Sequence, residues 1–124
     1  MLFRSRYDHA IDTRKVEEWA DTFVDEGSWD GGIKVEGKEA LLAFGHGLPT
    51  NPVFGPFTGA RHLNTNFVIE ETAPGEARLR CDNLMTIQRD GRVEIVALAG
   101  YDDRVVRRDG RWLFLSRKWR PVRA

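Results

Sequence analysis

The 124-residue sequence lacks the features of several large classes of protein. Its single cysteine, Cys81, excludes an internal disulfide and any metal site built from several thiolates. Nineteen basic and nineteen acidic residues cancel, so no overall charge attracts nucleic acid or an anionic membrane. The apolar runs are too short to span a bilayer, and the first residues lack the apolar segment of a secretory signal. We therefore expect a cytoplasmic protein without nucleic-acid or membrane partners.

Metal-binding patterns are also absent. The three histidines, His9, His46 and His62, fit no known metal-ligand spacing, so we predict no metal and no cofactor. The length and the 41% hydrophobic content suit one globular domain over residues 1–124, with no room for a second core.

The first part of the sequence has helical periodicity. Two stripes of apolar side chains follow one another: Tyr7, Ala10 and Ile11, then Val16, Trp19, Ala20 and Phe23. The step between the stripes breaks the phase, so we predict two helices, over residues 3–12 and 13–24. Asp12 or Thr13 is placed to cap the second helix.

Glycine and proline mark the segments that follow. The Asp-Gly-Gly sequence predicts a short hairpin over 28–36, and apolar spacing predicts a third helix over 38–44. The segment 45–59 is rich in glycine and proline, which predicts a long loop. Loops of this length often cover a binding site, and Phe54 is one of the apolar residues that this loop offers.

The rest of the chain is predicted to be a sheet. Its strand-like segments are 61–70, 77–88, 92–107 and 111–120. Short glycine-containing turns between them predict antiparallel neighbours. Helices segregated from an antiparallel sheet make an α+β domain.

The first of these strands has an unusual face. Side chains alternate along a strand, so His62, Asn64 and Asn66 share one side. An imidazole and two amides on one side predict either a wet surface or a pocket for a polar ligand. The opposite side, with Leu63, Thr65, Phe67 and Ile69, is typical of ordinary packing.

Several motifs together resemble the SnoaL-like branch of the NTF2-like superfamily. They are Tyr7-(x)4-Asp12, Trp19-(x)3-Phe23, Ser28-Trp29, Arg61-His62-Leu63-(x)2-Asn66, Tyr101-Asp102-Asp103 and Arg108-Asp109-Gly110-Arg111-Trp112. The resemblance spans almost the whole chain. It implies a cone-shaped fold, in which a curved antiparallel sheet and the N-terminal helices enclose a pocket, and a homodimer that forms through the outer face of the sheet.

The resemblance also implies candidate catalytic residues. Scytalone dehydratase, the hexachlorocyclohexane dehydrochlorinase and the bile-acid 7α-dehydratases use an aspartate to orient a histidine that abstracts a proton. Asp12 and His62 match that pair, and Tyr7 matches a tyrosine of the bile-acid enzymes. The second pocket histidine of scytalone dehydratase has no counterpart here, because Cys81-Asp82-Asn83 stands in its place.

Other candidates have a functional and a structural interpretation. Asn66, Asn83 and Tyr101 could hold a substrate oxygen or satisfy the backbone and pack, while Trp29 and Phe54 are expected in the core or the pocket wall. The basic C-terminal region is expected to be a solvated rim, partly paired with acids. Its members include Arg104, Arg107, Arg108, Arg111 and Arg117, with Asp102, Asp103 and Asp109 as partners.

Three functions are consistent with this sequence. One is a cofactor-free lyase or isomerase, dehydratase-like, acting on a small hydrophobic cyclic molecule. Another is a non-catalytic protein that binds an apolar small molecule in the same cavity. A third, a scaffold with a vestigial pocket, is the weakest. A contact between Asp12 and one ring nitrogen of His62, with the other nitrogen facing an open cavity, would favour catalysis. If protein groups bind both ring nitrogens, a binding or structural role is favoured.

Overall fold

The computed structural model describes the backbone of residues 3–122 and the side chains of residues 6–122. The first two residues, on which part of the expectation about a secretory signal depends, lie outside it. The helices are α1 (Phe3–Asp12), α2 (Val16–Ala20) and α3 (Lys38–Gly47), and two short 3-10 turns cover Leu48–Thr50 and Gly55–Phe57. The strands are β1 (Phe23–Asp30), β2 (Lys34–Glu36), β3 (Arg61–Ala73), β4 (Glu76–Arg89), β5 (Arg92–Arg108) and β6 (Arg111–Pro121).

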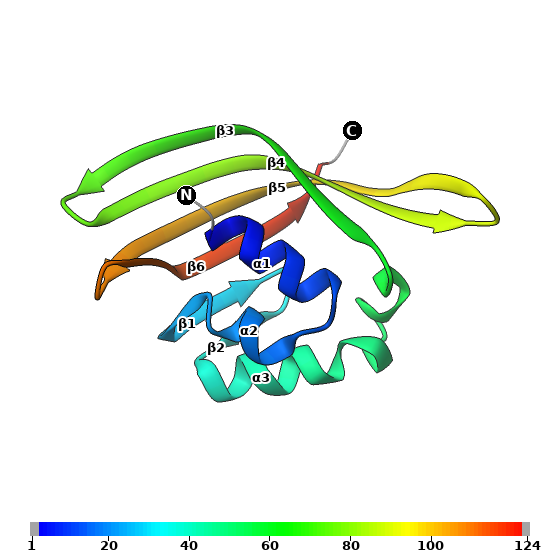
Figure 1. The fold of residues 1–124 in the computed structure, drawn as a ribbon, viewed down its shortest axis with the longest axis horizontal. Coiled ribbons are helices and arrows are strands. Elements are labelled where there is room, and N and C mark those ends of the chain that lie inside the picture. Colours follow the sequence, from blue (N-terminus) through cyan, green and yellow to red (C-terminus); the bar gives the residue numbers. More distant parts are fainter. Residues whose placement is uncertain (1–2, 123–124) are drawn as a thin grey trace.

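One curved sheet and a layer of helices make up the fold. The strand order is β2-β1-β6-β5-β4-β3, and all neighbours are antiparallel except β1 and β6. The three helices lie against one side of the sheet, and the β4–β5 hairpin extends beyond the rest of the molecule (Figure 1). The predicted α+β cone is therefore confirmed. None of the helices within residues 3–122 is long and apolar enough to cross a membrane.

Tight turns set the boundaries of the long strands, as the sequence predicts. Asp90-Gly91 and Asp109-Gly110 both have positive φ at each residue, between 51° and 75°. This conformation suits the right-handed twist of a hairpin, and Asp-Gly adopts it readily. The strands β4, β5 and β6 consequently begin and end within two residues of their predicted limits.

The predicted second helix over 13–24 is wrong at both ends. It spans only Val16–Ala20, because the Thr22 hydroxyl donates to the Trp19 carbonyl at 2.6 Å and the chain then becomes extended. Phe23 belongs to β1 and pairs in register with Phe114 of β6. Phe23 is buried because it packs in the sheet, and not because it belongs to an apolar stripe on a helix.

The predicted cap is also wrong. Lys15 occupies the position before α2 and makes no side-chain cap. The Thr13 hydroxyl instead donates back to the His9 carbonyl at 2.7 Å, and the Asp12 carboxylate is bonded to His62. The side chains of both predicted caps, Asp12 and Thr13, therefore form hydrogen bonds with other groups.

Helix α3 is longer than predicted. The sequence predicted its end at residue 44, but it continues to Gly47, and the two 3-10 turns occupy part of the predicted loop 45–59. Gly45 faces Val16 and Trp19 closely, since a Cβ there would lie 2.6 Å from a Val16 methyl. The missing side chain therefore allows α3 to pack against α2.

The register between paired strands shifts at several places, and one of these shifts changes the predicted faces of β3. In β3 the register shifts between Thr65 and Val68, and Asn66 has a φ of 58°. In β5 it shifts between Ile95 and Ala97, opposite Thr86 and Met85. The side chains beyond each bulge change sides, so the predicted common face of β3 is only partly correct.

The outer face of the sheet carries a row of leucines. Leu63 pairs with Leu84, which pairs with Leu98 on the next strand. Leu63 is 52% exposed and Leu98 is 51% exposed, so the prediction that Leu63, Phe67 and Ile69 pack within the chain is wrong. In this chain alone the row faces solvent.

Candidate functional site

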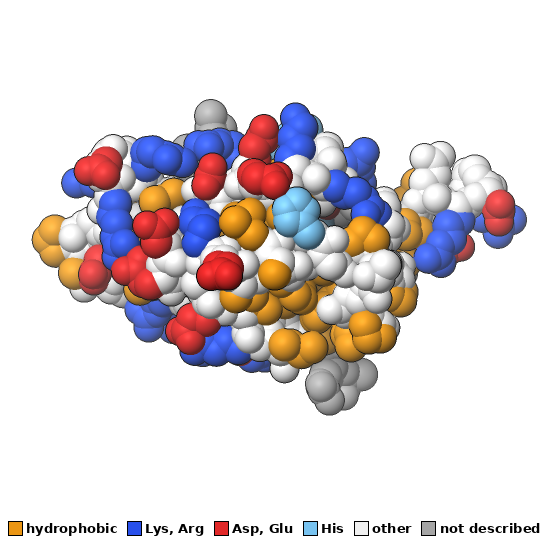
Figure 2. Space-filling view, turned by 90° about the horizontal axis from the view of Figure 1, so that it is seen from below, with side chains coloured by type: hydrophobic (Ala, Val, Ile, Leu, Met, Phe, Trp, Pro, Cys, Tyr) orange, Lys and Arg blue, Asp and Glu red, His pale blue; other side chains and the backbone are white. Residues whose placement is uncertain are grey.

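A cavity of about 300 Å³ lies between the three helices and the sheet. Aromatic side chains dominate its wall: Trp19, Trp29, Phe44, Phe54, Phe57 and Trp119. Seen from the side of the helices, hydrophobic side chains gather over α3 and the segment after it, while acids and bases mix over the remaining surface (Figure 2). Aromatic walls of this kind suit an apolar ring system. Trp29 and Phe54 thus line the pocket, where the sequence predicted them.

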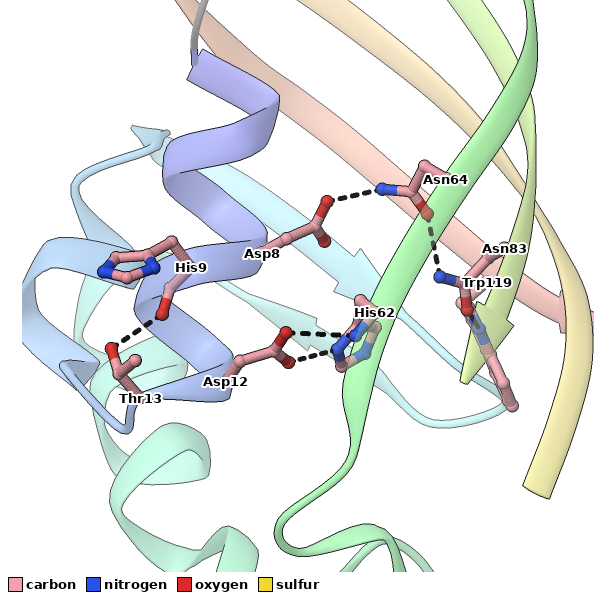
Figure 3. A network of polar contacts seen from close by, with 8 residues as sticks. All are labelled: Asp8, His9, Asp12, Thr13, His62, Asn64, Asn83 and Trp119. Carbon is pink, nitrogen blue, oxygen red and sulfur yellow. Dashed lines mark hydrogen bonds and ion pairs between the residues drawn. The ribbon is translucent and has the colours of Figure 1, made fainter. Parts of the chain in front are cut away.

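The Asp12 carboxylate of α1 makes two hydrogen bonds with His62 of β3. Its Oδ1 atom lies 2.5 Å from the ring Nδ1, and its Oδ2 atom accepts the backbone N–H of His62 at 3.0 Å. Both side chains are largely buried, with 8% of Asp12 and 15% of His62 exposed, and both line the cavity. Figure 3 shows the carboxylate pointing from the helix to the strand. The contact that favours catalysis over mere packing is therefore present.

This contact selects one tautomer of the neutral imidazole. A carboxylate accepts hydrogen bonds, so in the neutral ring Nδ1 carries the proton and Nε2 has the free lone pair. Among residues 6–122 no group forms a hydrogen bond with Nε2. A neutral ring of this kind can act as a base through the free nitrogen of a pocket-lining side chain, and a carboxylate beside it can stabilise the imidazolium that would form.

Tyr7 and Tyr101 also line the cavity, and their rings meet edge to face with centroids 6.4 Å apart. Burial raises the pKa of Tyr7 to about 12, and burial likewise raises the pKa of Tyr101 well above its usual value. Both hydroxyls therefore stay protonated at neutral pH. Each can act as a hydrogen-bond donor and not as a base.

Arg117 is the residue that the sequence analysis missed. It was predicted on a solvated rim, but it is fully buried, with its guanidinium carbon 3.5 Å from the ring centroid of Tyr101 and 4.3 Å from that of Tyr7. Its Nε lies 3.1 Å from the Asp103 carboxylate, which is also fully buried. Burial opposes the charge, but Asp103 outweighs it and raises the pKa of Arg117. A permanent cation therefore stands behind the two tyrosines.

The alternation along β6 could have revealed this position. Arg117 and Trp119 point to the same side of the strand, and their partners on β5 are Asp103 and Tyr101. Since Trp119 is a pocket residue, Arg117 had to point inward as well.

Asn83 is buried but lies behind the pocket rather than in its lining. The Trp119 indole N–H donates to its Oδ1 at 2.9 Å, and its Nδ2 donates to Asn64 Oδ1 at 2.8 Å. Asn64 in turn donates to Asp8 of α1 (Figure 3). Asn83 therefore does not occupy the predicted position for contacting a substrate. It belongs to a chain of hydrogen bonds that runs from Trp119 of β6 to Asp8 of α1.

Asn66 lies outside the cavity. It is exposed at the β3 bulge and donates to the Asp82 carboxylate at 2.8 Å. The bulge turned its side chain away from the face that it was predicted to share with His62. Its predicted contact with a ligand is therefore not supported by its position.

No three histidine, cysteine, aspartate or glutamate side chains gather as possible metal ligands in the described part of the chain. Cys81 is buried in the sheet next to Tyr101 of β5. The polar side chains of the lining described so far are the imidazole of His62, the carboxylate of Asp12 and the hydroxyls of Tyr7 and Tyr101.

The comparisons with solved structures give the same fold. An NTF2-like protein with a cystatin-like fold from Novosphingobium aromaticivorans is 15% identical, with a TM-score of 0.81, over 97% of this chain and 77% of that one. A protein of unknown function from Mycobacterium tuberculosis is 25% identical, with a TM-score of 0.85, over 98% of this chain and 69% of the other. The comparison with curated protein sequences finds no match.

A candidate scytalone dehydratase from Novosphingobium aromaticivorans is also similar, at 26% identity and a TM-score of 0.79, over 98% of this chain and 80% of that one. The family model for the SnoaL-like domain matches residues 3–118, which is nearly the whole chain. This match shows that the chain belongs to the SnoaL-like family, and its fold is that of the NTF2-like neighbour.

Proposed function

We propose that this protein is a cofactor-free lyase or isomerase that acts on a small hydrophobic cyclic substrate. The observation that carries the proposal is the 2.5 Å contact between Asp12 Oδ1 and His62 Nδ1 at the wall of an aromatic cavity. In the neutral ring this contact makes Nε2 of His62 the nitrogen with the free lone pair, and Nε2 has no hydrogen-bond partner among residues 6–122. Such a nitrogen can take a proton from a carbon next to a carbonyl group.

The reaction then has two steps. His62 Nε2 takes the α-proton, the C–H electron pair becomes the enolate π-bond, and the negative charge moves to the carbonyl oxygen. Tyr7 or Tyr101 donates a hydrogen bond to that oxygen, and Asp12 stabilises the imidazolium. In the second step the carbonyl re-forms. For dehydration, the enolate π-pair becomes a new C=C bond as the β C–O bond breaks, and the imidazolium gives its proton to the departing hydroxyl, which leaves as water. For isomerisation, a conjugated enolate takes the proton from the imidazolium at its γ-carbon instead, and the double bond shifts.

The second candidate is a binding protein without catalysis. The Asp12 carboxylate also accepts the backbone N–H of His62 at 3.0 Å, and this bond docks α1 on β3 whether or not the ring reacts. A protein that only holds an apolar molecule would need that docking as well. The two functions share the cavity and differ only in what the ring of His62 does.

Proton exchange separates the two candidates. The protein is incubated in D₂O with 2-tetralone and related bicyclic ketones, and deuterium at the α-carbon is measured by mass spectrometry. We expect faster exchange with the wild type and a loss of roughly 10²–10⁴-fold in His62→Gln, the usual contribution of one general base. The variant should retain the wild-type circular dichroism spectrum. Ketones that bind but exchange no faster than in buffer would support the binding protein instead.

We also propose that the chain works in the cytoplasm as a homodimer. The row of Leu63, Leu84 and Leu98 supports the dimer, because exposed contiguous apolar surface on a sheet commonly marks an interface. A second copy of the chain would remove these side chains from water.

A further inference from the structure

The mouth of the cavity is formed by the exposed members of its lining. These are Arg14, His46, Pro49, Thr58 and Gly59, whereas the other lining residues are buried or half-buried. Arg14 lies in the short connection between α1 and α2, two residues after Asp12. The same segment of the chain therefore supplies the partner of His62 and one side of the mouth.

Arg14 is the permanent cation of the lining. The described lining residues include no lysine and no second arginine. Within residues 6–122 the Arg14 guanidinium forms no hydrogen bond or ion pair. A ligand that fills the cavity therefore meets an uncompensated positive charge at the mouth.

The acids near this mouth are already engaged. Asp12, the carboxylate of the lining, is held by His62. Glu17 of α2 has its Oε1 atom 3.0 Å from Nε2 of His46, on the other side of the mouth. Neither carboxylate is bonded to Arg14, so its charge is available to a ligand.

The backbone of Arg14 is in a conformation that favours glycine. Its φ is 60°, and Lys15 donates its N–H to the Ala10 carbonyl at 2.8 Å, a helix ending in which the left-handed position is usually glycine. A side chain at this position has a conformational cost that glycine would not have. Residues held in such conformations are concentrated at functional sites. The residue with this unfavourable backbone conformation is the same one that places a charge at the mouth.

We infer that the cavity takes ligands that combine an apolar ring body with an anionic group, a carboxylate above all, and that Arg14 binds this group at the mouth. The inference rests on the proposed function, since it assumes that the cavity holds the substrate. The rings would pack against the aromatic wall, and the guanidinium would offer its parallel N–H donors to the carboxylate.

A pair of matched probes tests the inference without knowledge of the natural substrate. 2-Naphthylacetate and 2-naphthylacetamide have the same rings and differ in charge at neutral pH. Met85 lines the cavity and is one of two methionines, so its labelled methyl resonance reports occupancy of the cavity by NMR. We expect the wild type to bind the acid roughly three- to tenfold more tightly than the amide at low salt, with a smaller preference at high salt.

Three variants assign the preference to one residue. Arg14→Gln and Arg14→Gly should abolish it while changing the affinity for the amide less than about twofold. Arg14→Gly should also raise the melting temperature, because glycine suits the left-handed backbone. Lys15→Gln removes the same charge at the neighbouring exposed residue, which does not line the cavity, and should retain the preference.

The outcomes are separable. Equal binding of both probes by the wild type, or a preference that persists in both Arg14 variants, would overturn the role of Arg14 and leave the proposed function standing. If neither probe shifts the Met85 resonance, the cavity is not a binding site for such molecules, and the proposed function fails together with the inference.

Discussion

Asp8 of α1 accepts a hydrogen bond from Asn64 of β3. Asp8 lies one helical turn before Asp12, and Asn64 lies two residues after His62. Four residues of a helix advance about 6 Å, and two residues of a strand advance about 6.6 Å. The two carboxylates of α1 therefore match the two polar side chains of β3 in spacing (Figure 3). The helix is held on the strand in one register, which places Asp12 against the ring of His62.

The chain of amides behind the cavity should contribute strongly to stability. Asn83→Leu would leave the Trp119 N–H and the Asn64 carbonyl oxygen without their partner. We expect a decrease of about 2–4 kcal/mol in the free energy of unfolding, measured in urea, because each buried polar group would lose its hydrogen bond. Asn66→Gly is the matched control, since that amide is exposed and glycine tolerates its φ of 58°. Equal effects of the two substitutions would contradict a special role for the buried chain.

Replacing Asp12 by asparagine should change the tautomer of His62. The amide can present an N–H to Nδ1, which then has to accept, so the proton moves to Nε2 and the base is lost. We expect the ¹⁵N shifts of the ring to report a proton on Nδ1 in the wild type and on Nε2 in Asp12→Asn, with proton exchange reduced at least about tenfold.

The control for this change is Asp8→Asn, one turn earlier on the same helix. Its carbonyl oxygen can still accept from Asn64, so the tautomer of His62 should not change. A wild-type ring that already carries its proton on Nε2 would refute the assignment of His62 as the base.

Stability should fall at alkaline pH because of the buried tyrosines. Tyr7 has a pKa of about 12 in the folded chain against an ordinary value of 10.0, with burial as the main cause. Below pH 10 both states keep the proton and stability is unaffected. Between pH 10 and 12 only the unfolded chain loses the proton, so the free energy of unfolding decreases, by about 2 kcal/mol at pH 12 for this group.

Urea unfolding at several values of pH from 9 to 12 measures this effect. Tyr7→Phe should flatten the decline, and the remaining slope reports Tyr101, whose pKa burial also raises. Parallel curves for the wild type and Tyr7→Phe would show that Tyr7 titrates normally in the folded protein.

The proposed dimer should depend on the leucine row. Leu98→Glu places a charge at one end of the leucine row, on an exposed residue, and burying that charge in an interface is unfavourable. We expect the wild type to sediment as a dimer at high micromolar concentration and the variant as a 14.2 kDa monomer. Ile33→Glu, which lies in the β1–β2 turn away from this row, should remain dimeric. A monomeric wild type under these conditions would exclude the interface.

Local sequence determined much of this protein. The Asp-Gly turns set the ends of the long strands because Asp-Gly adopts a positive φ at low cost. The alternation along β4 is equally local, since every second residue from Ala77 to Ile87 is buried. The helical stripe of Tyr7, Ala10 and Ile11 predicted α1 in the same way. These features depend on neighbours within a few residues, so the sequence can specify them directly.

Only the tertiary structure decided the rest. The bulge at Asn66 removed that side chain from the cavity, and strand pairing drew Phe23 from a predicted helix into the sheet. Arg117 became a buried cation because it pairs with Asp103 and lies over the ring of Tyr101, and Asp12 became the partner of His62 instead of a helix cap. In each case the stabilising interaction is with a residue far along the chain. A contact across 50 residues, such as that of Asp12 with His62, has no local pattern, and only the resemblance to a family pointed to it.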